Sequence, residues 1–288
     1  MLAPKRFLAL LALVVSASAW AVPQATVDAV VTPAWLERNG REQALAPGME
    51  IKHGDHIRTG EGARAYLKLA EGSTVKLGEN AKFAFFSRSI RPQTIFKGWF
   101  DVAAGAFRFT TDALRKVKAR EVSIRVGTAT VGIRGTDVWG KTDATRDLVM
   151  LIDGHIQLDH SSGKTIEMAQ PLTAFISPKD GAPLSVESVT PEDFKARARE
   201  TEIEAGDGAA RTGGKWKLLL GSHAAQAAAL EQYDIARGEG FGVRIIPRRA
   251  ESGWNYEVVM KGYADEAEAF KAAARLKAAT GIEATTTK

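Results

Sequence analysis

The sequence predicts a mainly β domain over residues 22–185, followed by a small α+β domain over residues 214–288. Three observations predict this arrangement. From about residue 24 onward, apolar and polar residues alternate with a period of two, which places one face of each strand on a core. Glycine turns such as Asn39-Gly40 and Asp153-Gly154 separate these runs. Beyond residue 213, two helix-length patterns alternate with strands instead.

Residues 1–21 have the three parts of a secretory signal peptide. The basic pair Lys5-Arg6 precedes an apolar run over residues 7–15, and small residues flank a cleavage point at Ala19-Trp20-Ala21. The run is shorter than the ~20 apolar residues that a membrane-spanning helix needs. We therefore expect a cleaved signal, no transmembrane segment in the mature chain, and a periplasmic location in a Gram-negative bacterium.

Composition argues against several classes of function. The chain has no cysteine, so we expect neither disulfides nor thiolate metal sites. Its net charge of +5 over 288 residues, without a basic stripe, does not predict nucleic-acid binding. His53 and His56 flank one turn and His155 and His160 flank a hairpin, without acidic partners at metal-ligand spacing. We expect no metal, no cofactor and no enzymatic activity.

The strands of the β domain follow one another closely. Alternating apolar residues mark strands at Ala65 to Leu69, Val75 to Leu77, Phe83 to Phe85, Phe107 to Phe109 and Val122 to Val126. No amphipathic helix of useful length separates them, which favours a sandwich, a roll or a β-solenoid-like stack over a parallel α/β fold. Trp99 and Trp139 lie inside such strand patterns, where a tryptophan more often belongs to the core than to a ligand site.

The stretch TATVGIRGTDVW, residues 128–139, contains glycines that could suggest a phosphate loop. Its β-branched residues predict strands on both sides of a glycine, and no helix follows that could direct backbone N–H groups at a phosphate. Thr136 has no histidine nearby in sequence, and Asp137 has no second carboxylate at a suggestive spacing. We expect Arg134 and Asp137 to satisfy the backbone and each other around a structural turn.

Three segments together resemble the FecR-type periplasmic domain: HGDHIRTGEGARAYLKLAEGSTVKLGENAKF (53–83), GWFDVAAGAFRF (98–109) and VGTATVGIRGTDVW (126–139). The resemblance implies an all-β, non-enzymatic module that binds, scaffolds or senses. Its namesakes relay a signal across the inner membrane through a cytoplasmic segment and a transmembrane helix, neither of which this sequence predicts. Only the role of the outer domain carries over, and its partner stays open.

Residues 186–213 predict a charged helix and a flexible linker. Thr190 can cap the helix, and Pro191 suits its first position. Phe194 and Ile203 are the large apolar residues of the charged stretch, so we expect a solvated helix. The glycines that follow predict a tether between the domains.

The C-terminal domain has the predicted element order β-α-β-β-α-β. The first strand is KWKLLLGS, residues 224–237 form a helix that ends at Gly238, and FGVRIIP and WNYEVVMKG form two further strands. Asp265 caps a second helix with Glu268 at the capping-box position, and IEATTTK can supply a last strand. This order describes a split βαβ unit, an antiparallel sheet with two helices on one face.

Residues 213–288 resemble a SPOR domain, whose fold is the same split βαβ unit. The resemblance lies in Gly221-Ser222 at the end of the first strand, in the alanine-rich helix and in the aromatic-rich third strand. It implies binding of peptidoglycan glycan strands that have lost their stem peptides. The family usually has V-Q-x-G-S-F on the first strand, where this chain has Leu218, Leu219 and His223.

Strand alternation predicts which side chains of this domain form a ligand-binding face away from the helices. The expected residues are Lys217, Leu219, Ser222, Arg244, Trp254, Glu257 and Val259. Arg244 and Ser222 suit a glycan, whereas Leu219, Ile246 and Val259 form an aliphatic cluster that suits a protein contact. The strand register near Trp254 stays open.

We therefore expect a non-catalytic secreted protein whose SPOR-like domain targets it to peptidoglycan and whose FecR-type domain is a binding, scaffold or sensor module. The alternative is an envelope protein–protein interaction scaffold, in which the SPOR-like sheet face binds an envelope protein or a second copy of the chain. The oligomeric state does not follow from the sequence.

Overall fold

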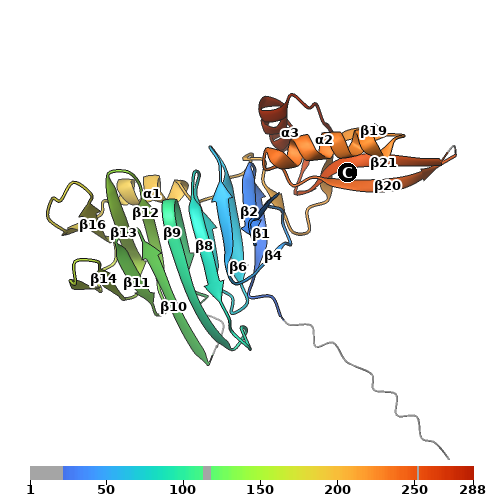
Figure 1. The fold of residues 1–288 in the computed structure, drawn as a ribbon. Coiled ribbons are helices and arrows are strands. Elements are labelled where there is room, and N and C mark those ends of the chain that lie inside the picture. Colours follow the sequence, from blue (N-terminus) through green and yellow to red (C-terminus); the bar gives the residue numbers. More distant parts are fainter. Residues whose placement is uncertain (1–21, 113–117, 252) are drawn as a thin grey trace, which may run out of the picture.

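The computed structural model describes residues 22–112, 118–251 and 253–288; the predicted signal peptide, residues 1–21, lies outside them. A β-rich body is followed by a smaller α+β unit, which confirms the predicted fold class (Figure 1). Within the described residues, no helix is long and apolar enough to span a membrane.

The β-rich body consists of two sheets packed on each other. Sheet A has the strand order β4, β1, β6, β7, β9, β12, β13, β16, β17. Its strands are β4 (Glu50–Ile51), β1 (Ala25–Val31), β6 (Arg64–Leu69), β7 (Thr74–Leu77), β9 (Ile95–Thr110), β12 (Asp137–Thr142), β13 (Arg146–Asp153), β16 (Thr173–Pro178) and β17 (Ser185–Ser188).

Sheet B has the order β3, β2, β5, β8, β9, β10, β11, β14, β15. Its other strands are β3 (Arg41–Ala44), β2 (Ala34–Arg38), β5 (Asp55–Thr59), β8 (Lys82–Ser87), β10 (Ala119–Val126), β11 (Ala129–Ile133), β14 (Ile156–His160) and β15 (Thr165–Met168). Strand β9 belongs to both sheets and passes from one to the other near Gly105, whose φ is +80°. A Cβ there would lie 2.6 Å from the Cα of Ala81, so this crossing requires glycine.

The core lies between the two sheets and is rich in phenylalanine. Phe83 and Phe85 of sheet B lie 5.6 and 5.1 Å from Phe100, ring centroid to ring centroid. Trp139 is fully buried, as expected, in a separate cluster with Leu148 and Met150. Trp99 was expected in the core, but its side chain is 38% exposed on the outer face of sheet B.

The stretch over residues 128–139 forms β11 and the start of β12, with a turn between them. Asp137 pairs with Arg108 on β9 through two hydrogen bonds of 2.9 and 2.7 Å, and not with Arg134. Asp147 accepts hydrogen bonds from the backbone N–H and the hydroxyl of Thr128. Burial alone would raise the pKa of Asp147, but its hydrogen bonds hold that pKa below the ordinary value. These polar groups are structural.

Helix α1 (Pro191–Arg199) lies against the outer face of sheet A, although none of its residues is fully buried. The Thr190 hydroxyl accepts a hydrogen bond of 3.1 Å from the N–H of Asp193. Thr190 is therefore the N-cap of the helix, as predicted. Phe194 packs with the cluster around Trp139. The helix is therefore docked through Phe194 and solvated elsewhere.

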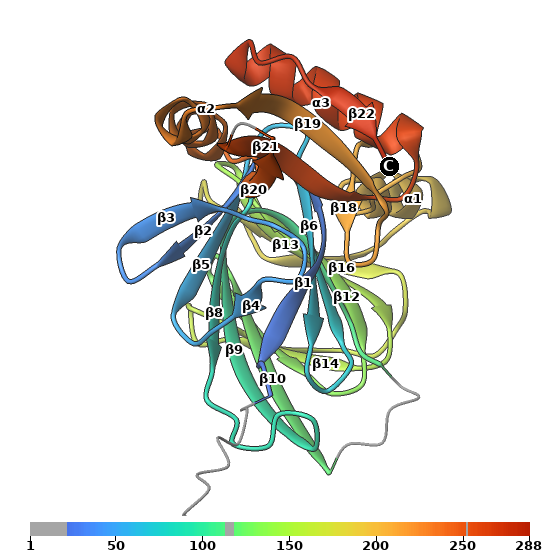
Figure 2. The ribbon, with the colours of Figure 1, turned by 90° about the vertical axis from the view of Figure 1, so that its right-hand side faces the viewer.

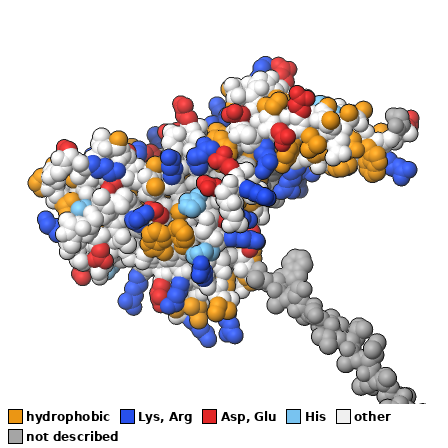
Figure 3. Space-filling model, in the orientation of Figure 1, with side chains coloured by type: hydrophobic (Ala, Val, Ile, Leu, Met, Phe, Trp, Pro, Cys, Tyr) orange, Lys and Arg blue, Asp and Glu red, His pale blue; other side chains and the backbone are white. Residues whose placement is uncertain are grey.

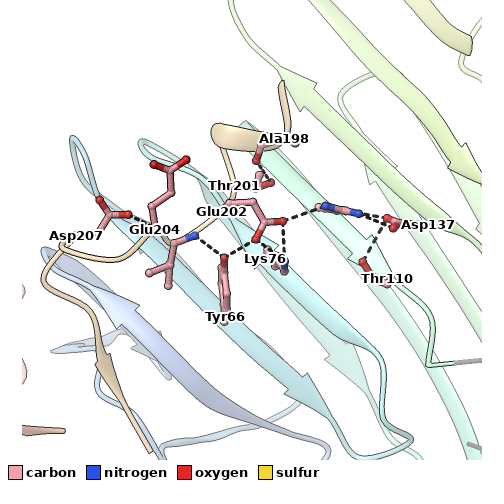
Figure 4. A network of polar contacts seen from close by, with 11 residues as sticks. Tyr66, Lys76, Thr110, Asp137, Ala198, Thr201, Glu202, Glu204 and Asp207 are labelled. Atoms are coloured by element: carbon pink, nitrogen blue, oxygen red, sulfur yellow. Dashed lines mark hydrogen bonds and ion pairs between the residues drawn. The ribbon is translucent and has the colours of Figure 1, made fainter. Parts of the chain in front are cut away.

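The residues after α1 run along sheet A and are held there by Glu202 (Figure 4). Its carboxylate accepts hydrogen bonds of 2.6 and 2.7 Å from Lys76, 3.0 Å from Tyr66 and 3.0 Å from Arg108. Burial raises the pKa of Glu202, but the bonds from Lys76 and Tyr66 and the charge of Arg108 outweigh it, so the pKa is lowered.

The glycine-rich segment that follows, predicted as a flexible linker, is held against the C-terminal unit instead. The Glu268 carboxylate accepts hydrogen bonds of 2.7 to 2.8 Å from the N–H groups of Gly206, Gly208 and Ala209. Both glycines have positive φ, which lets these N–H groups converge on one carboxylate. Composition alone predicts a tether here because the carboxylate that orders the segment lies about sixty residues further along the chain.

A short strand after this segment pairs with a strand of each unit. Strand β18 (Ala210–Arg211) pairs with β1 on one side and, through Ala210 and Tyr263, with β21 on the other. The Nε1 of Trp35 also donates a hydrogen bond of 3.1 Å to the carbonyl oxygen of Gly238, and the N–H of Ala34 one of 3.1 Å to that of Gly240. The two units therefore contact each other through main chain and side chain.

The C-terminal unit has the predicted order β-α-β-β-α-β. Its elements are β19 (Trp216–His223), α2 (Gln226–Gly238), β20 (Arg244–Ala250), β21 (Gly253–Tyr263), α3 (Glu266–Thr280) and β22 (Thr285–Thr287). The sheet order is β20, β21, β19, β22. Both helices lie on one face of the sheet, with the C-terminal end of α2 against the β-rich body, and the β20–β21 hairpin projects beyond that body (Figures 1 and 2). Among the described residues, the opposite face of the sheet carries no helix.

Candidate functional site: the helix-free face of the C-terminal sheet

The strand register brings together six of the seven predicted site residues on the helix-free face. Leu219 and Arg244 flank Val259 in one cross-strand row, and Ser222 pairs with Glu257 in the next. Lys217 pairs with Lys261, which belongs to the same face and was not among the predicted residues. The binding role of these residues stays a prediction.

Trp254 does not belong to this face. Trp254, Tyr256 and Val258 occupy alternate positions of β21, and Tyr256 and Val258 pack into the cluster under the helices. Since successive side chains of a strand point to opposite faces, Trp254 has the helix-side orientation. Its side chain is 55% exposed because the hairpin projects beyond the body. The prediction that Trp254 contributes to the ligand face is wrong for this reason.

Ser222 reaches the helix-free face through a β-bulge. The register of β19 against β21 shifts between Leu219 and Gly221, so that Leu220 is the extra residue. Leu218 and Leu220 are both buried under the helices, and the bulge returns Ser222 to the outer face. Strict alternation would have turned Ser222 inward with them.

The departures from the usual first-strand motif have different places in the structure. His223 points to the helices, where its Nε2 lies 2.9 Å from the Oε1 of Gln232 on α2. A Cβ on Gly221 would meet that same oxygen at 2.4 Å, so this position requires glycine. Leu218 is buried in the core, and only Leu219 changes the helix-free face itself.

The helix-free face carries an excess of unpaired positive charge. Within the described residues, Lys217, Arg244 and Lys261 make no hydrogen bond or ion pair through their side chains. The carboxylate of Glu257 is already bound by Arg248, with an Nε–Oε2 distance of 3.3 Å. Three cations on one open face can hold an anionic ligand without competition from a neighbouring carboxylate.

The aliphatic residues of this face expose little surface. Val259 is fully buried because it stands on a central strand between Leu219 and Arg244. Leu219 and Ile246 are partly buried, and none of the three is among the large hydrophobic side chains that the described residues expose. The aliphatic cluster anticipated from the sequence is therefore not an open apolar patch.

At one end, this face meets the β-rich body in a pocket of 300 Å³. The pocket is lined by Ala46, Pro47, Arg211, Thr212, Gly213, Gly214, Gly242, Arg244, Lys261 and Gly262. It contains three cations and no carboxylate, and Ala46 and Pro47 come from the β-rich body. A Cβ on Gly214 would lie 2.2 Å from the backbone carbonyl carbon of Gly262, so the close approach of these segments requires glycine.

The arrangement suits the binding of a ligand. Among the described residues, the Ser222 hydroxyl makes no hydrogen bond, and the Glu257 carboxylate is engaged by Arg248. Within residues 22–112, 118–251 and 253–288, no group of histidine, aspartate and glutamate side chains is placed to hold a metal ion. The face can form charge-assisted hydrogen bonds to a ligand through fixed donors.

Comparisons with known proteins give two family models and distant structural likenesses. No curated protein matches the chain. Two crystal structures described as a candidate anti-sigma factor from Parabacteroides distasonis ATCC 8503 are each 14% identical to it. They cover 72% and 81% of this chain and 98% and 99% of their own, with TM-scores of 0.39 and 0.40. A likeness this low carries no argument about fold or function.

The family models match at separate places along the chain. The model described as FecR protein matches residues 55–157, within the two-sheet body. The model described as SPOR domain matches residues 212–288, which include the helix-free face. Domains of these two kinds bind or sense ligands rather than catalyse reactions, and SPOR domains bind peptidoglycan. The chain therefore contains a FecR domain followed by a SPOR domain.

Proposed function

We propose that this protein is a non-catalytic component of the periplasm whose SPOR domain holds it on peptidoglycan glycan strands that have lost their stem peptides. The proposed binding surface is the helix-free face, with Lys217, Arg244 and Lys261 as its cations. The observation that carries this proposal is that these three cations have no partner of opposite charge among the described residues.

The chemistry of the stripped strand accounts for this charge. Removal of a stem peptide leaves a free lactyl carboxylate on each N-acetylmuramic acid, where a complete strand has an amide. A hydrogen bond between a cation and a carboxylate is roughly twice as strong as a neutral one. The planar guanidinium of Arg244 can bind a carboxylate through two parallel bonds. A stripped strand should therefore bind better than a peptide-bearing one.

The FecR domain would act as a binding, scaffold or sensor module that the SPOR domain carries to the wall. Support comes from the contacts at the junction, where β18 pairs with both domains and Glu202 holds the connecting segment on sheet A. Ala46 and Pro47 of the N-terminal body also line the cationic pocket. The FecR domain would thus face the wall in a set orientation.

The alternative, in which the helix-free face binds an envelope protein or a second copy of the chain, has less support. An open apolar patch would mark a protein contact of that kind. Here Val259 is fully buried, and Leu219 and Ile246 are only partly exposed.

Co-sedimentation with purified sacculi tests the proposal. The chain over residues 22–288 should pellet with sacculi whose stem peptides have been removed by an amidase, and more weakly with untreated sacculi. Arg244→Glu should reduce pelleting, and Trp254→Ala, an exposed residue of the opposite orientation, is the matched control. Equal pelleting of the Arg244→Glu variant and the unaltered chain would reject this surface.

A further inference from the structure

The outer face of sheet B carries a second, differently built site. Its centre is a groove of 590 Å³, a volume within the range of about 300–1,000 Å³ that small-molecule sites occupy. Figure 3 shows hydrophobic side chains gathered beside histidine, acidic and basic ones on one face of the β-rich body. This groove lies in the FecR domain and shares no residue with the helix-free face of the SPOR domain.

The strand register explains why this face is hollow. One cross-strand row runs from Glu37 through His56, Ala84 and Asp101 to Arg125. The small side chain of Ala84 lies in the middle of this row, with larger side chains on every neighbouring strand. A depression forms where the alanine stands.

Phe86 and Trp99 form one wall of the groove, and Arg58, stacked on the buried ring of Trp35, forms the other. On one side, the rings of Phe86 and Trp99 lie 4.9 Å apart and Trp99 is 38% exposed. On the other side, the guanidinium of Arg58 lies 3.6 Å from the ring centroid of Trp35. Beyond Phe86 and Trp99, the groove continues into a second hollow of 330 Å³ that includes His53. Phe86 and Trp99 therefore line both hollows.

The charges of the groove are balanced and largely paired. Glu37, Glu42 and Asp101 face Arg58, Lys82 and Arg125. Arg58 binds Glu42 at 3.0 Å, and Arg125 binds Asp101 through two hydrogen bonds, one of them 2.9 Å long. The pairs hold their planar groups in fixed positions, so the ordering cost on binding a ligand is small.

We propose that this groove binds a neutral saccharide chain. A sugar ring has an apolar face of C–H groups, which can pack on an exposed aromatic ring, and a rim of hydroxyls, which can bond to fixed carboxylates and guanidinium groups. The equal number of acidic and basic residues offers no attraction to a polyanion. On the SPOR face, by contrast, Lys217, Arg244 and Lys261 are unpaired among the described residues. The site is independent of the proposed glycan site on the SPOR domain.

Isothermal titration of the chain over residues 22–288 with chitotetraose and with cellotetraose tests this proposal. We expect at least one of these neutral oligosaccharides to bind. Trp99→Ala and Phe86→Ala should each raise the Kd about tenfold, equivalent to about 1.4 kcal/mol of lost stacking. Trp99→Phe, which keeps an aromatic ring, should retain most of the affinity.

Two control variants separate the groove from other effects. Ile95 lies on β9, the strand of Trp99, but outside the groove, and its side chain is 40% exposed. Ile95→Ala should therefore leave the Kd unchanged. Arg244→Glu should also leave it unchanged, which distinguishes this site from the SPOR face. Thermal melts of all variants check that they fold. The absence of binding by both oligosaccharides, binding that survives Trp99→Ala and Phe86→Ala, or binding that Arg244→Glu abolishes would each overturn the proposal.

Discussion

The helix-free face of the SPOR domain and the groove on sheet B are both outward faces of β-sheets. They differ in how their charged side chains are paired. On the SPOR face, Lys217, Arg244 and Lys261 have no partner among the residues that the structure describes, and the carboxylate of Glu257 is bound by Arg248. In the groove, acidic and basic side chains are equal in number and two of the pairs are in contact.

This difference determines the charge of the ligand that each surface can bind. Unpaired cations attract an anionic polymer, and their attraction weakens with salt. Paired charges keep little long-range attraction, but they hold planar hydrogen-bonding groups in place beside the aromatic rings. Two sheets of similar backbone geometry can therefore bind ligands of different charge within one chain.

Charge reversal on the SPOR face should have the largest effect on ligand binding among the variants considered. Arg244→Glu places a carboxylate where the cationic pocket would meet the ligand. We expect affinity for amidase-treated sacculi to fall by a factor of about 10–150, since hydrogen bonds to charged groups contribute about 1.5–3 kcal/mol. Oligosaccharide binding at the groove should not change. Loss of both activities in the same variant would mean that the two surfaces are not separate.

Removal of the Glu202 carboxylate tests whether the connecting segment matters for either surface. Glu202→Ala leaves Lys76 and Arg108 without this partner, so we expect the free energy of unfolding to fall by about 2 kcal/mol in a denaturant titration. Glu204→Ala, at an exposed neighbour with only a 3.8 Å ion pair, should change it by less than about 0.5 kcal/mol.

The Glu202 carboxylate should also make the stability of the protein fall as the pH is lowered. The pKa of Glu202 is lowered by Lys76, Tyr66 and Arg108, so its stabilising effect is complete above its unfolded value of 4.5 and is lost as the pH falls through the lower folded value. Between pH 5 and 3, Glu202→Gln should therefore lose less stability than the unaltered chain. An identical loss in both proteins would contradict the assigned role.

A higher salt concentration should weaken binding at the SPOR face more than binding at the groove. Raising the salt concentration from about 0.05 to 0.5 M shortens the screening length, so binding to treated sacculi should weaken several-fold. Oligosaccharide binding at the groove, whose acidic and basic residues are equal in number, should change less than twofold. Equal salt dependence at both sites would remove the distinction drawn from their charges.

Leu219→Gln should have the smallest effect. Leu219 is partly buried beside Val259, and glutamine restores the residue usual at this position in the family. We expect pelleting with treated sacculi to rise by about twofold, because a neutral hydrogen bond at the weak end of its usual range contributes about 0.5 kcal/mol. A large loss of binding would instead indicate that Leu219 contacts the ligand through its apolar side chain.

Much of the fold follows from local pattern. The period-two runs predict the strands and the element order of both domains, and the alternation along β20 and β21 predicts the face of Arg244, Glu257 and Val259 correctly. Trp99 could also have been assigned to the outer face, because it shares its parity with Lys97 and Asp101 while Phe96 and Phe100 are buried. The pattern was present, but a tryptophan inside a strand favoured the core.

What the amino-acid sequence determined by itself was the set of strands and helices, their order, and the two faces of most strands, because side-chain periodicity is a property of neighbouring residues. The tertiary structure alone decided the bulge at Leu220 that turns Ser222 outward and the course of the segment held by Glu202 and Glu268. Each of these depends on partners about thirty or more residues away, and the hollow at Ala84 likewise exists only where five strands meet in one sheet.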